Sequence, residues 1–399
     1  MVSLSLQQAS LLSANKANKK LRGAPRGRTF KIEGKTFMNR DNIDTREVLA
    51  AYFTETPSYC APYGNGHIND TFLVVVGKRY IMQRMNTTIF TKPVELMANI
   101  VGVTEHIRNK ARAAGGDVER ASLVVVPTLA GKDYFCDSNG YYWRVYDFCE
   151  RTITRERVEN GNDFYTCGKA FGNFQQMLAD YPAAQLTESI ANFHNTPWRY
   201  ENLMKAVEKD AVGRLSGVLP EVEFARAREA FCKTLENARE AGTLPLRVTH
   251  NDTKLNNILF DEKTGDPVCV IDLDTIMPGY SVNDFGDSIR FGANTAVEDE
   301  TDLSKVTLDL DLFRLYAKGF LEGCNGSLTA KELELLPVGA MMMTLECGMR
   351  FLTDHLEGDV YFRIHRENHN LDRARNQFAL VADMEKKLDE MNKIIKELA

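Results

Sequence analysis

Carboxylate and amide side chains flank two short apolar runs in this 399-residue chain. Asp252 and Asn257 come before the first run, and Asp272 and Asp274 follow the second. Between the runs lies a polar segment with Gly265, a pattern that predicts a β-hairpin. Because a hairpin brings the start of one strand beside the end of the other, these four side chains should converge. Mg²⁺ prefers such oxygen ligands and shares them with substrate phosphates, so the pattern predicts a magnesium-phosphate centre.

The spacing of these residues indicates which reaction the centre could catalyse. His250, Asp252 and Asn257 stand at the intervals of the kinase catalytic loop, in which the Asp accepts the hydroxyl proton and the Asn binds metal. Asp272 takes the place of the metal-binding Asp that protein kinases carry in Asp-Phe-Gly. A polar hairpin capped by surface carboxylates would need several elements to fall in register by chance. The spacing therefore predicts a phosphotransferase centre.

A glycine-containing segment upstream offers contacts to phosphate. Residues 62–76 have the pattern of a strand, a turn and a second strand, with Gly64, Gly66 and Asn69 in the turn region. Glycine lets the bare backbone approach phosphate oxygens, although an ordinary hairpin turn would need no ligand. We expect nucleotide contacts from these three residues.

The next predicted strand, residues 79–85, lies where kinases carry a phosphate-holding lysine. No Val-Ala-Ile-Lys sequence is present there. Either Gln83 or Arg84 would take that role, and the alternation of side chains along the strand does not decide between them.

The remaining patterns predict an α+β, bilobal fold of the protein kinase type. About five strands and one helix are expected before residue 150, which gives a β-rich nucleotide-binding lobe over residues 37–148. Helices are then expected in a C-terminal lobe, residues 149–399, with the ligand site between the lobes. The predicted helices are 164–179, 201–215, 221–241, 308–322, 329–354 and 371–399.

Composition limits the classes of partner. The net charge is −6, so nucleic acid and anionic membranes are not expected partners. No apolar run has the length of a membrane span. The eight cysteines form no C-x-x-C pair, which is typical of reduced thiols in a cytoplasmic protein. We expect a cytoplasmic monomer.

The first 36 residues differ from the rest of the chain. They are rich in Lys, Arg, Ser and Asn, and Glu33 is the first acidic residue. An organellar address has this composition, but we interpret the segment as a disordered basic extension.

Three sequences, HNDTKLNNILFD from His250, CVIDLDTIMPG from Cys269 and DFGDSIRFG from Asp284, resemble the aminoglycoside/choline kinase-like phosphotransferase superfamily. Within it they look like the N-acetylhexosamine 1-kinase branch. The resemblance covers about residues 45–390, and it implies the bilobal aminoglycoside phosphotransferase-like fold. It also implies transfer of the γ-phosphoryl group of ATP to the anomeric hydroxyl of N-acetylglucosamine or N-acetylgalactosamine.

The resemblance implies a role for each catalytic residue. Asp252 accepts the hydroxyl proton and aims the oxygen at the γ-phosphorus, while Asn257 and Asp272 hold Mg²⁺. Asp274 either joins them or supports them. His250 braces the loop, and Lys254 stabilises charge on the moving phosphoryl group. We also expect Asp287 and Arg290 to fasten the catalytic hairpin.

Sugar binding needs convergent polar groups, which one C-terminal stretch supplies. We expect Arg350, Asp354, Asp359 and Tyr361 to bind the substrate. The alternative for Arg350 and Asp354, which lie four residues apart, is a surface salt bridge on one helix face.

Two other functions stay open. A kinase of the same fold could act on another alcohol, such as choline, an aminoglycoside, homoserine or another sugar; a cationic acceptor would call for an acid-lined pocket, which Arg350 opposes. A catalytically silent ATP-binding protein would have lost its base or metal ligands, and Asp252, Asn257 and Asp272 are all present.

Overall fold

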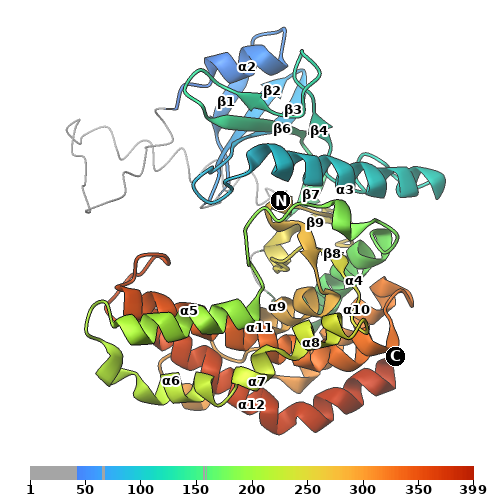
Figure 1. Cartoon of the computed structure of the whole chain (residues 1–399). Helices are drawn as coiled ribbons and strands as arrows, with labels where there is room; N and C mark the ends of the chain where they lie inside the picture. Colours follow the sequence, from blue (N-terminus) through green and yellow to red (C-terminus); the bar gives the residue numbers. More distant parts are fainter. Residues whose placement is uncertain (1–42, 65–67, 156–157, 159) are drawn as a thin grey trace, which may run out of the picture. The chain divides into compact units, whose positions relative to one another are not determined.

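The computed structural model describes residues 43–64, 68–155, 158 and 160–399, and residues 45–399 form one compact unit. Its N-terminal part is an antiparallel sheet with the strand order β1-β2-β3-β6-β4, in which β5 also pairs with β6 (Figure 1). The strands are β1 (Tyr59–Pro62), β2 (Asp70–Val76), β3 (Lys78–Arg84), β4 (Val125–Val126), β5 (Phe135–Cys136) and β6 (Tyr142–Asp147). Helices α2 (Arg46–Tyr52) and α3 (Pro93–Ala113) complete this part. The predicted β-rich lobe is confirmed, with one more strand than expected.

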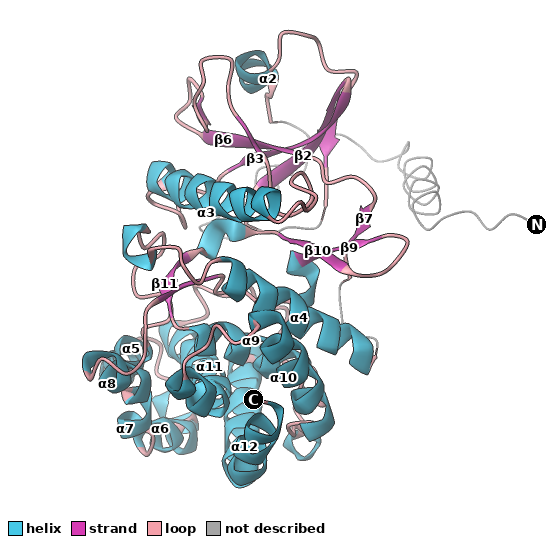
Figure 2. Cartoon of the chain, turned by 90° about the vertical axis from the view of Figure 1, so that its right-hand side faces the viewer, coloured by secondary structure: helices cyan, strands magenta, loops and turns pink. Residues whose placement is uncertain are grey.

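The predicted hairpin is also confirmed. β9 (Ile258–Asp261) pairs with β10 (Pro267–Val270), and Gly265 has the left-handed φ of +74° in the turn. The amide of Ile271 donates to the carbonyl of Asn257 over 2.9 Å, which joins the start of one strand to the end of the other. β7 (Thr152–Ile153) adds a third strand beside β9, and Figure 2 shows these short strands in magenta.

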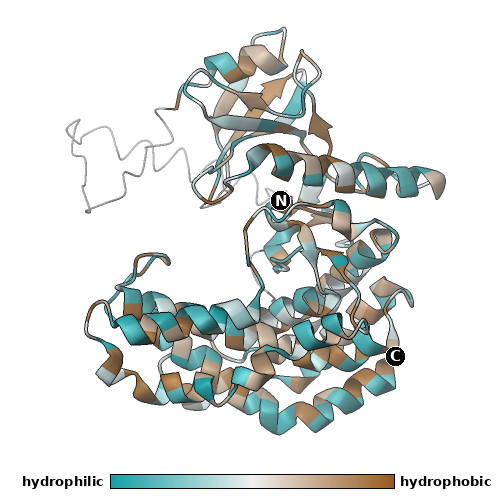
Figure 3. Ribbon diagram, in the orientation of Figure 1, coloured by the Kyte–Doolittle hydropathy of each residue, from teal (hydrophilic) through white to brown (hydrophobic). Residues whose placement is uncertain are grey.

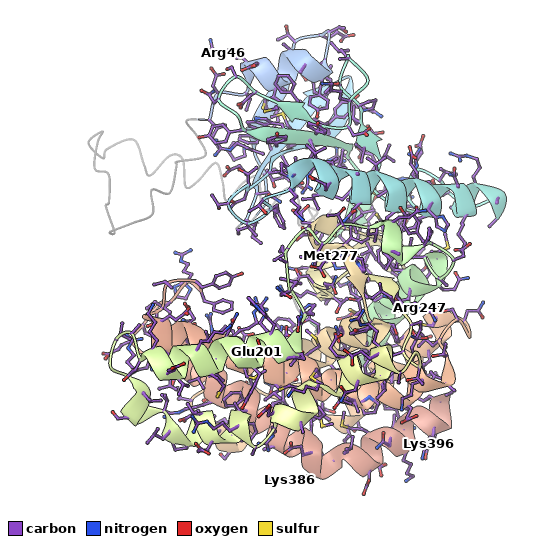
Figure 4. All side chains as sticks on the ribbon, viewed as in Figure 1. Arg46, Glu201, Arg247, Met277, Lys386 and Lys396 are labelled. Carbon is purple, nitrogen blue, oxygen red and sulfur yellow. The ribbon has the colours of Figure 1, made fainter. Side chains whose placement is uncertain are left out.

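A second strand pair frames the hairpin. β8 (Arg247–Thr249) pairs with β11 (Met277–Gly279), and Figure 4 labels Arg247 and Met277 on these strands. Arg247 forms an ion pair with the buried Glu332 over 2.7 Å. Both ends of the segment that carries the predicted catalytic residues are therefore fixed.

The C-terminal part is helical, and hydrophilic and hydrophobic residues alternate along its helices, as amphipathic helices around a core require (Figure 3). The predicted helices correspond, with shifted ends, to α4 (Gly161–Met177), α5 (Thr196–Lys209), α10 (Leu310–Cys324), α11 (Ala330–Glu357) and α12 (His369–Leu398). The single helix predicted over residues 221–241 is wrong, because the chain forms three short helices there. These are α6 (Leu219–Arg226), α7 (Glu229–Cys232) and α8 (Thr234–Glu240).

After the second strand of the hairpin the sequence predicts a polar loop up to Arg290, but the chain forms helix α9 (Ser281–Gly292) there. Val282, Phe285 and Ile289 are fully buried at helical spacing, and this apolar stripe was obscured by the polar residues and glycines between them. Gly286 lies against the backbone of Gly339 in α11, where a larger side chain would not fit. α9 is therefore a core helix under the catalytic residues.

Helix α11 is long and apolar enough, by length and composition, to cross a membrane. The sequence analysis predicted a helix here but not that it is long and apolar enough to pass this test. It is the one such helix in the described part of the chain, and 83% of its most apolar stretch is buried inside the protein. A helix that is hydrophobic on most sides can also form the core of a folded protein.

Candidate active site

The structure brings Asp252, Lys254 and Asn257 into direct contact. Asn257 Nδ2 donates to the Asp252 carbonyl over 2.8 Å and to Asp252 Oδ2 over 3.1 Å. Lys254 Nζ lies 2.5 Å from Asp252 Oδ1. Burial opposes the charge on the ammonium, but Asp252 and then Asp287 raise the pKa of Lys254 above its ordinary value. The Asp252 carboxylate is thus oriented by the Asn257 amide and by the charged ammonium of Lys254.

His250 braces this loop through a fully buried ring. Its Nε2 lies 2.9 Å from the carbonyl of Ile271, and its Nδ1 lies 3.3 Å from the backbone nitrogen of Asp252. A carbonyl can only accept a hydrogen bond, and a backbone N–H can only donate, so we assign the hydrogen to Nε2 and an uncharged ring. His250 therefore ties the catalytic loop to the strand that leads into Asp272.

Asp272 stands among other carboxylates. Its backbone has the left-handed φ of +59°, and its side chain keeps solvent-exposed surface. Surrounding protein atoms raise the pKa of Asp272 to about 6, and the charges of Asp274 and Asp252 act in the same direction. Arg144 lowers it, but by less. Asp272 and its neighbours thus form a site of excess negative charge that a cation would stabilise.

This donor set fits Mg²⁺ held jointly with phosphates. Among the described residues, no three His, Cys, Asp or Glu side chains form a ready metal-binding group. The Asn257 amide donates through Nδ2, which leaves Oδ1 on the opposite side of the amide, and Asp272 offers a carboxylate. Mg²⁺ typically takes one or two protein oxygens and completes its shell with water and substrate phosphates.

Asp274 has different surroundings, and both of its oxygens are engaged. It is 3% exposed, forms an ion pair with Arg144 of β6, and accepts a hydrogen bond from Asn69 Nδ2 over 2.5 Å. Of the two alternatives for Asp274, these contacts favour support over direct metal binding. They also join the sheet to the segment after β10.

Arg144 is a residue that the sequence analysis missed. It is 2% exposed, and its Nε donates to Gln83 Oε1 over 2.9 Å. Burial opposes its charge, but Asp274 and other neighbours, Asp272 among them, keep the pKa of Arg144 above its ordinary value. The strand register pairs Gln83 with Arg144. The only signal in the sequence was a charged residue within an apolar strand.

The other residues predicted to contact the nucleotide have different partners. Arg84 forms an ion pair with Asp70 over 2.6 Å, whereas Gln83 faces Arg144. Gly64 has a φ of +74°, and no atom of the described residues lies within 4 Å of where its Cβ would be, while Gly66 lies outside the described residues. Of the two strand residues, Gln83 is therefore the one that is joined to Asp274, through Arg144.

Two acidic residues of α9 hold the catalytic loop by its backbone. Asp284 accepts from the N–H groups of His250 and Asn251 over 2.9 and 2.8 Å, and from Gln175 over 2.7 Å. Asp287 accepts from the N–H of Thr253 over 3.1 Å and pairs with Arg290. These bonds confirm that Asp287 and Arg290 fasten the hairpin. Asp284 was missed, although its spacing to Asp287 puts both on one helix face.

The predicted substrate residues fall into two groups. Asp354 is 3% exposed and accepts from the N–H groups of Tyr361 and Phe362, and Asp359 pairs with Arg214 over 2.6 Å. These two acids shape the turn after α11. Arg350 and Tyr361 have no such role, and Tyr361 is 64% exposed.

Arg350 lies between aromatic rings on the side of the catalytic loop. Its guanidinium carbon is 5.7 Å from the ring centre of Phe193 and 5.5 Å from that of Phe362. Among the described residues, no ion pair joins Arg350 to Asp354, so the alternative of a surface salt bridge is not found. Phe193 precedes His194, whose Nε2 lies 3.2 Å from the carbonyl of Asn251. A chain of contacts thus leads from Arg350 to the residue before Asp252.

Comparisons with known proteins agree with this geometry. A model of the phosphotransferase enzyme family (APH) matches residues 60–312, more than half of the chain. A microcompartment-associated aminopropanol kinase is similar at 16% identity with a TM-score of 0.56, over 86% of this chain and 97% of that one. An aminoglycoside phosphotransferase from Alicyclobacillus acidocaldarius is similar at 13% identity with a TM-score of 0.58, over 89% of this chain and 97% of that one.

At such identities the likeness to solved structures shows the fold, which is the protein kinase-like fold with an antiparallel sheet followed by a helical region. The matched family residues include the whole catalytic loop and the carboxylates after β10. This chain belongs to the APH phosphotransferase enzyme family and is a small-molecule kinase.

Proposed function

We propose that this kinase phosphorylates the anomeric hydroxyl of an N-acetylhexosamine, N-acetylglucosamine or N-acetylgalactosamine, with Mg-ATP as donor. The observation that carries the acceptor class is the pair of arginines Arg199 and Arg350. Burial, and then the charge of Arg350, lower the pKa of Arg199 below its ordinary value. Arg199 Nη2 donates to the Phe193 carbonyl over 2.8 Å, and its buried Nε has no hydrogen-bond partner within the described residues.

Two neighbouring guanidinium groups disfavour an ammonium-bearing acceptor such as choline or an aminoglycoside. They suit an uncharged polyol, because a guanidinium presents parallel N–H donors that match adjacent oxygens. The Phe193 and Phe362 rings beside Arg350 add apolar surface for a sugar face. A neutral sugar therefore fits these residues better than an amino alcohol does.

The chemical step assigns one task to each residue of the loop. Asp252 accepts the proton of the anomeric hydroxyl as that oxygen bonds to the γ-phosphorus, and the bond from the γ-phosphorus to the bridging oxygen breaks to release ADP. Lys254 and Asn257 keep the Asp252 carboxylate in one orientation. Asp272 and Asn257 would hold Mg²⁺, which neutralises phosphate charge when bound. Arg144 and Gln83 border the same carboxylates from the sheet.

The test measures ADP release with N-acetylglucosamine, N-acetylgalactosamine, glucose, galactose and choline as acceptors. We expect the N-acetylhexosamines to give the largest kcat/KM and choline to give none. A preference for choline, or no response to any sugar, would refute the proposed acceptor.

The role of Asp252 is tested by a matched pair of variants. Asp252→Asn should abolish turnover while Mg-ATP binding and the thermal midpoint stay near wild type. Asp266→Asn, in the exposed turn of the same hairpin, should keep wild-type turnover. Near wild-type turnover in Asp252→Asn would remove Asp252 from the mechanism.

A further inference from the structure

Histidine rings hold both ends of the peptide unit between Asn251 and Asp252. Its N–H, on Asp252, donates to His250 Nδ1 over 3.3 Å. Its carbonyl, on Asn251, lies 3.2 Å from His194 Nε2, and a carbonyl can only accept, so we assign a hydrogen to that nitrogen. Because the peptide unit is planar, these two bonds fix its orientation and the direction in which the Asp252 side chain leaves the backbone.

The backbone at this point needs such support. Asn251 has a φ of +64°, in the left-handed region that residues other than glycine rarely adopt. Its side chain donates to the carbonyls of Thr249 and Thr275, which fixes Asn251 itself. Those bonds leave its own carbonyl to His194.

His194 is held in turn by a buried carboxylate of α11. Its Nδ1 lies 2.8 Å from Glu346 Oε1, and Thr196 donates to Glu346 Oε2 over 2.7 Å. Glu346 is 1% exposed; burial would raise its pKa, but His194, Arg350 and Arg199 keep the pKa of Glu346 below its ordinary value. Glu346 is therefore a carboxylate, and both ring nitrogens of His194 act as donors.

We propose that the pair of His194 and Glu346 is a positioning unit that orients Asp252 through the Asn251–Asp252 peptide. This inference rests on the proposed role of Asp252. His194 contacts the backbone of the catalytic loop and takes no proton from the acceptor. His194 follows Phe193 in one loop, and Glu346 lies one turn before Arg350 in α11. The same loop and the same helix therefore carry the residues that orient Asp252 and those proposed to bind the acceptor.

Two variants of His194 separate positioning from packing. In His194→Gln the amide nitrogen can reach the place of Nε2 and keep the bond to the Asn251 carbonyl. In His194→Asn the shorter amide reaches the place of Nδ1 and keeps only the bond to Glu346. We expect His194→Asn to lower kcat about 30-fold with the KM of Mg-ATP within about twofold, and His194→Gln to stay within about threefold of wild type.

Thermal unfolding of each variant, with kcat measured well below the lowest midpoint, controls for stability. If His194→Asn does not fold, the same comparison is made in the Glu346→Gln background, where no buried charge is left unpaired. Equal losses in both variants, a wild-type kcat in His194→Asn, or a kcat that follows the unfolding midpoint would overturn the positioning role. An inactive Asp252→Asn beside a fully active His194→Asn defeats this inference alone, whereas an active Asp252→Asn defeats the proposed function.

Discussion

Two pairs of acidic residues border the catalytic loop, and their surroundings differ. Asp284 and Asp287 of α9 are buried and accept hydrogen bonds from the backbone of the loop. Asp272, after β10, faces other carboxylates, and among the described residues none donates a hydrogen bond to it. The first pair is satisfied within the protein, whereas the carboxylate of Asp272 is open to solvent and to a bound cation. Aspartates between residues 272 and 287 therefore differ in role: Asp284 and Asp287 hold the backbone of the loop, whereas Asp272 is open to a bound cation.

Among the acids compared here, Asp272 should show the largest effect on turnover when it is changed to Asn. Loss of this carboxylate would remove a proposed metal ligand, so we expect kcat to fall about 10³-fold or more, the scale of losing one preorganised electrostatic group. The folded protein should be no less stable, because the change relieves repulsion with Asp274 and Asp252. Turnover with saturating Mg-ATP, together with urea unfolding, measures both. A stable variant with near wild-type kcat would show that Asp272 has no more part in the reaction than Asp284 and Asp287 do.

Asp284→Asn should act in the opposite way, chiefly on stability. An amide cannot accept from both backbone N–H groups and from Gln175, so buried donors lose their partner. We expect the free energy of unfolding to fall by about 3 kcal/mol. Urea unfolding of the variant beside Asp266→Asn provides the measurement and its control. An unchanged midpoint would show that α9 does not hold the loop.

Asp274 could belong either with the acids that hold the structure or with the proposed metal ligand Asp272. It follows β10 as Asp272 does, yet its contacts with Arg144 and Asn69 are those of a structural acid. Arg144→Met leaves this buried carboxylate unpaired and should cost about 3 kcal/mol in unfolding free energy, with much of it recovered in Arg144→Met/Asp274→Asn. If the double variant regains stability but loses turnover as Asp272→Asn does, then Asp274 belongs with the metal ligands.

The smallest effect concerns the pH dependence of Asp287. Burial would raise its pKa, but Arg290, Lys254 and His194 hold the pKa of Asp287 below its ordinary value. A lowered pKa means that ionised Asp287 stabilises the fold above the unfolded value of about 4, and that this contribution is lost as the pH falls further. Asp287→Asn should therefore lower the thermal midpoint at pH 7 by a few degrees, and the difference should shrink below about pH 4. A difference independent of pH would assign the loss to packing.

Local chemistry decided which parts of the site could be predicted. The hairpin followed from Gly265 between two apolar runs, and the catalytic loop followed from fixed spacing, because both depend on neighbours in the chain. Helix α9 was missed because its apolar stripe is thin among polar residues. Arg144 was missed because its partners, Gln83 and Asp274, are distant in sequence and meet it only through strand register and tertiary packing.

Two of the four residues predicted to bind the sugar have other partners in the structure. Asp354 and Asp359 have the right chemistry for a sugar, but a turn needs acceptors for its free N–H groups, and the backbone after α11 uses Asp354 for this. Asp359 pairs with Arg214 and accepts from the side chain of Asn370. Arg350, four residues before Asp354, has no such demand from the backbone. Residue type alone does not distinguish a turn acceptor from a ligand group.

The contacts of Asp274 with Asn69 and Arg144 bear on how the protein could move. Both partners belong to the N-terminal sheet region, and Asp274 lies two residues after Asp272. A hinge rotation of the sheet away from the helices must break these bonds or pull the segment that carries Asp272 along with it. Opening for nucleotide exchange would therefore be linked mechanically to the position of the carboxylate that we propose as a magnesium ligand.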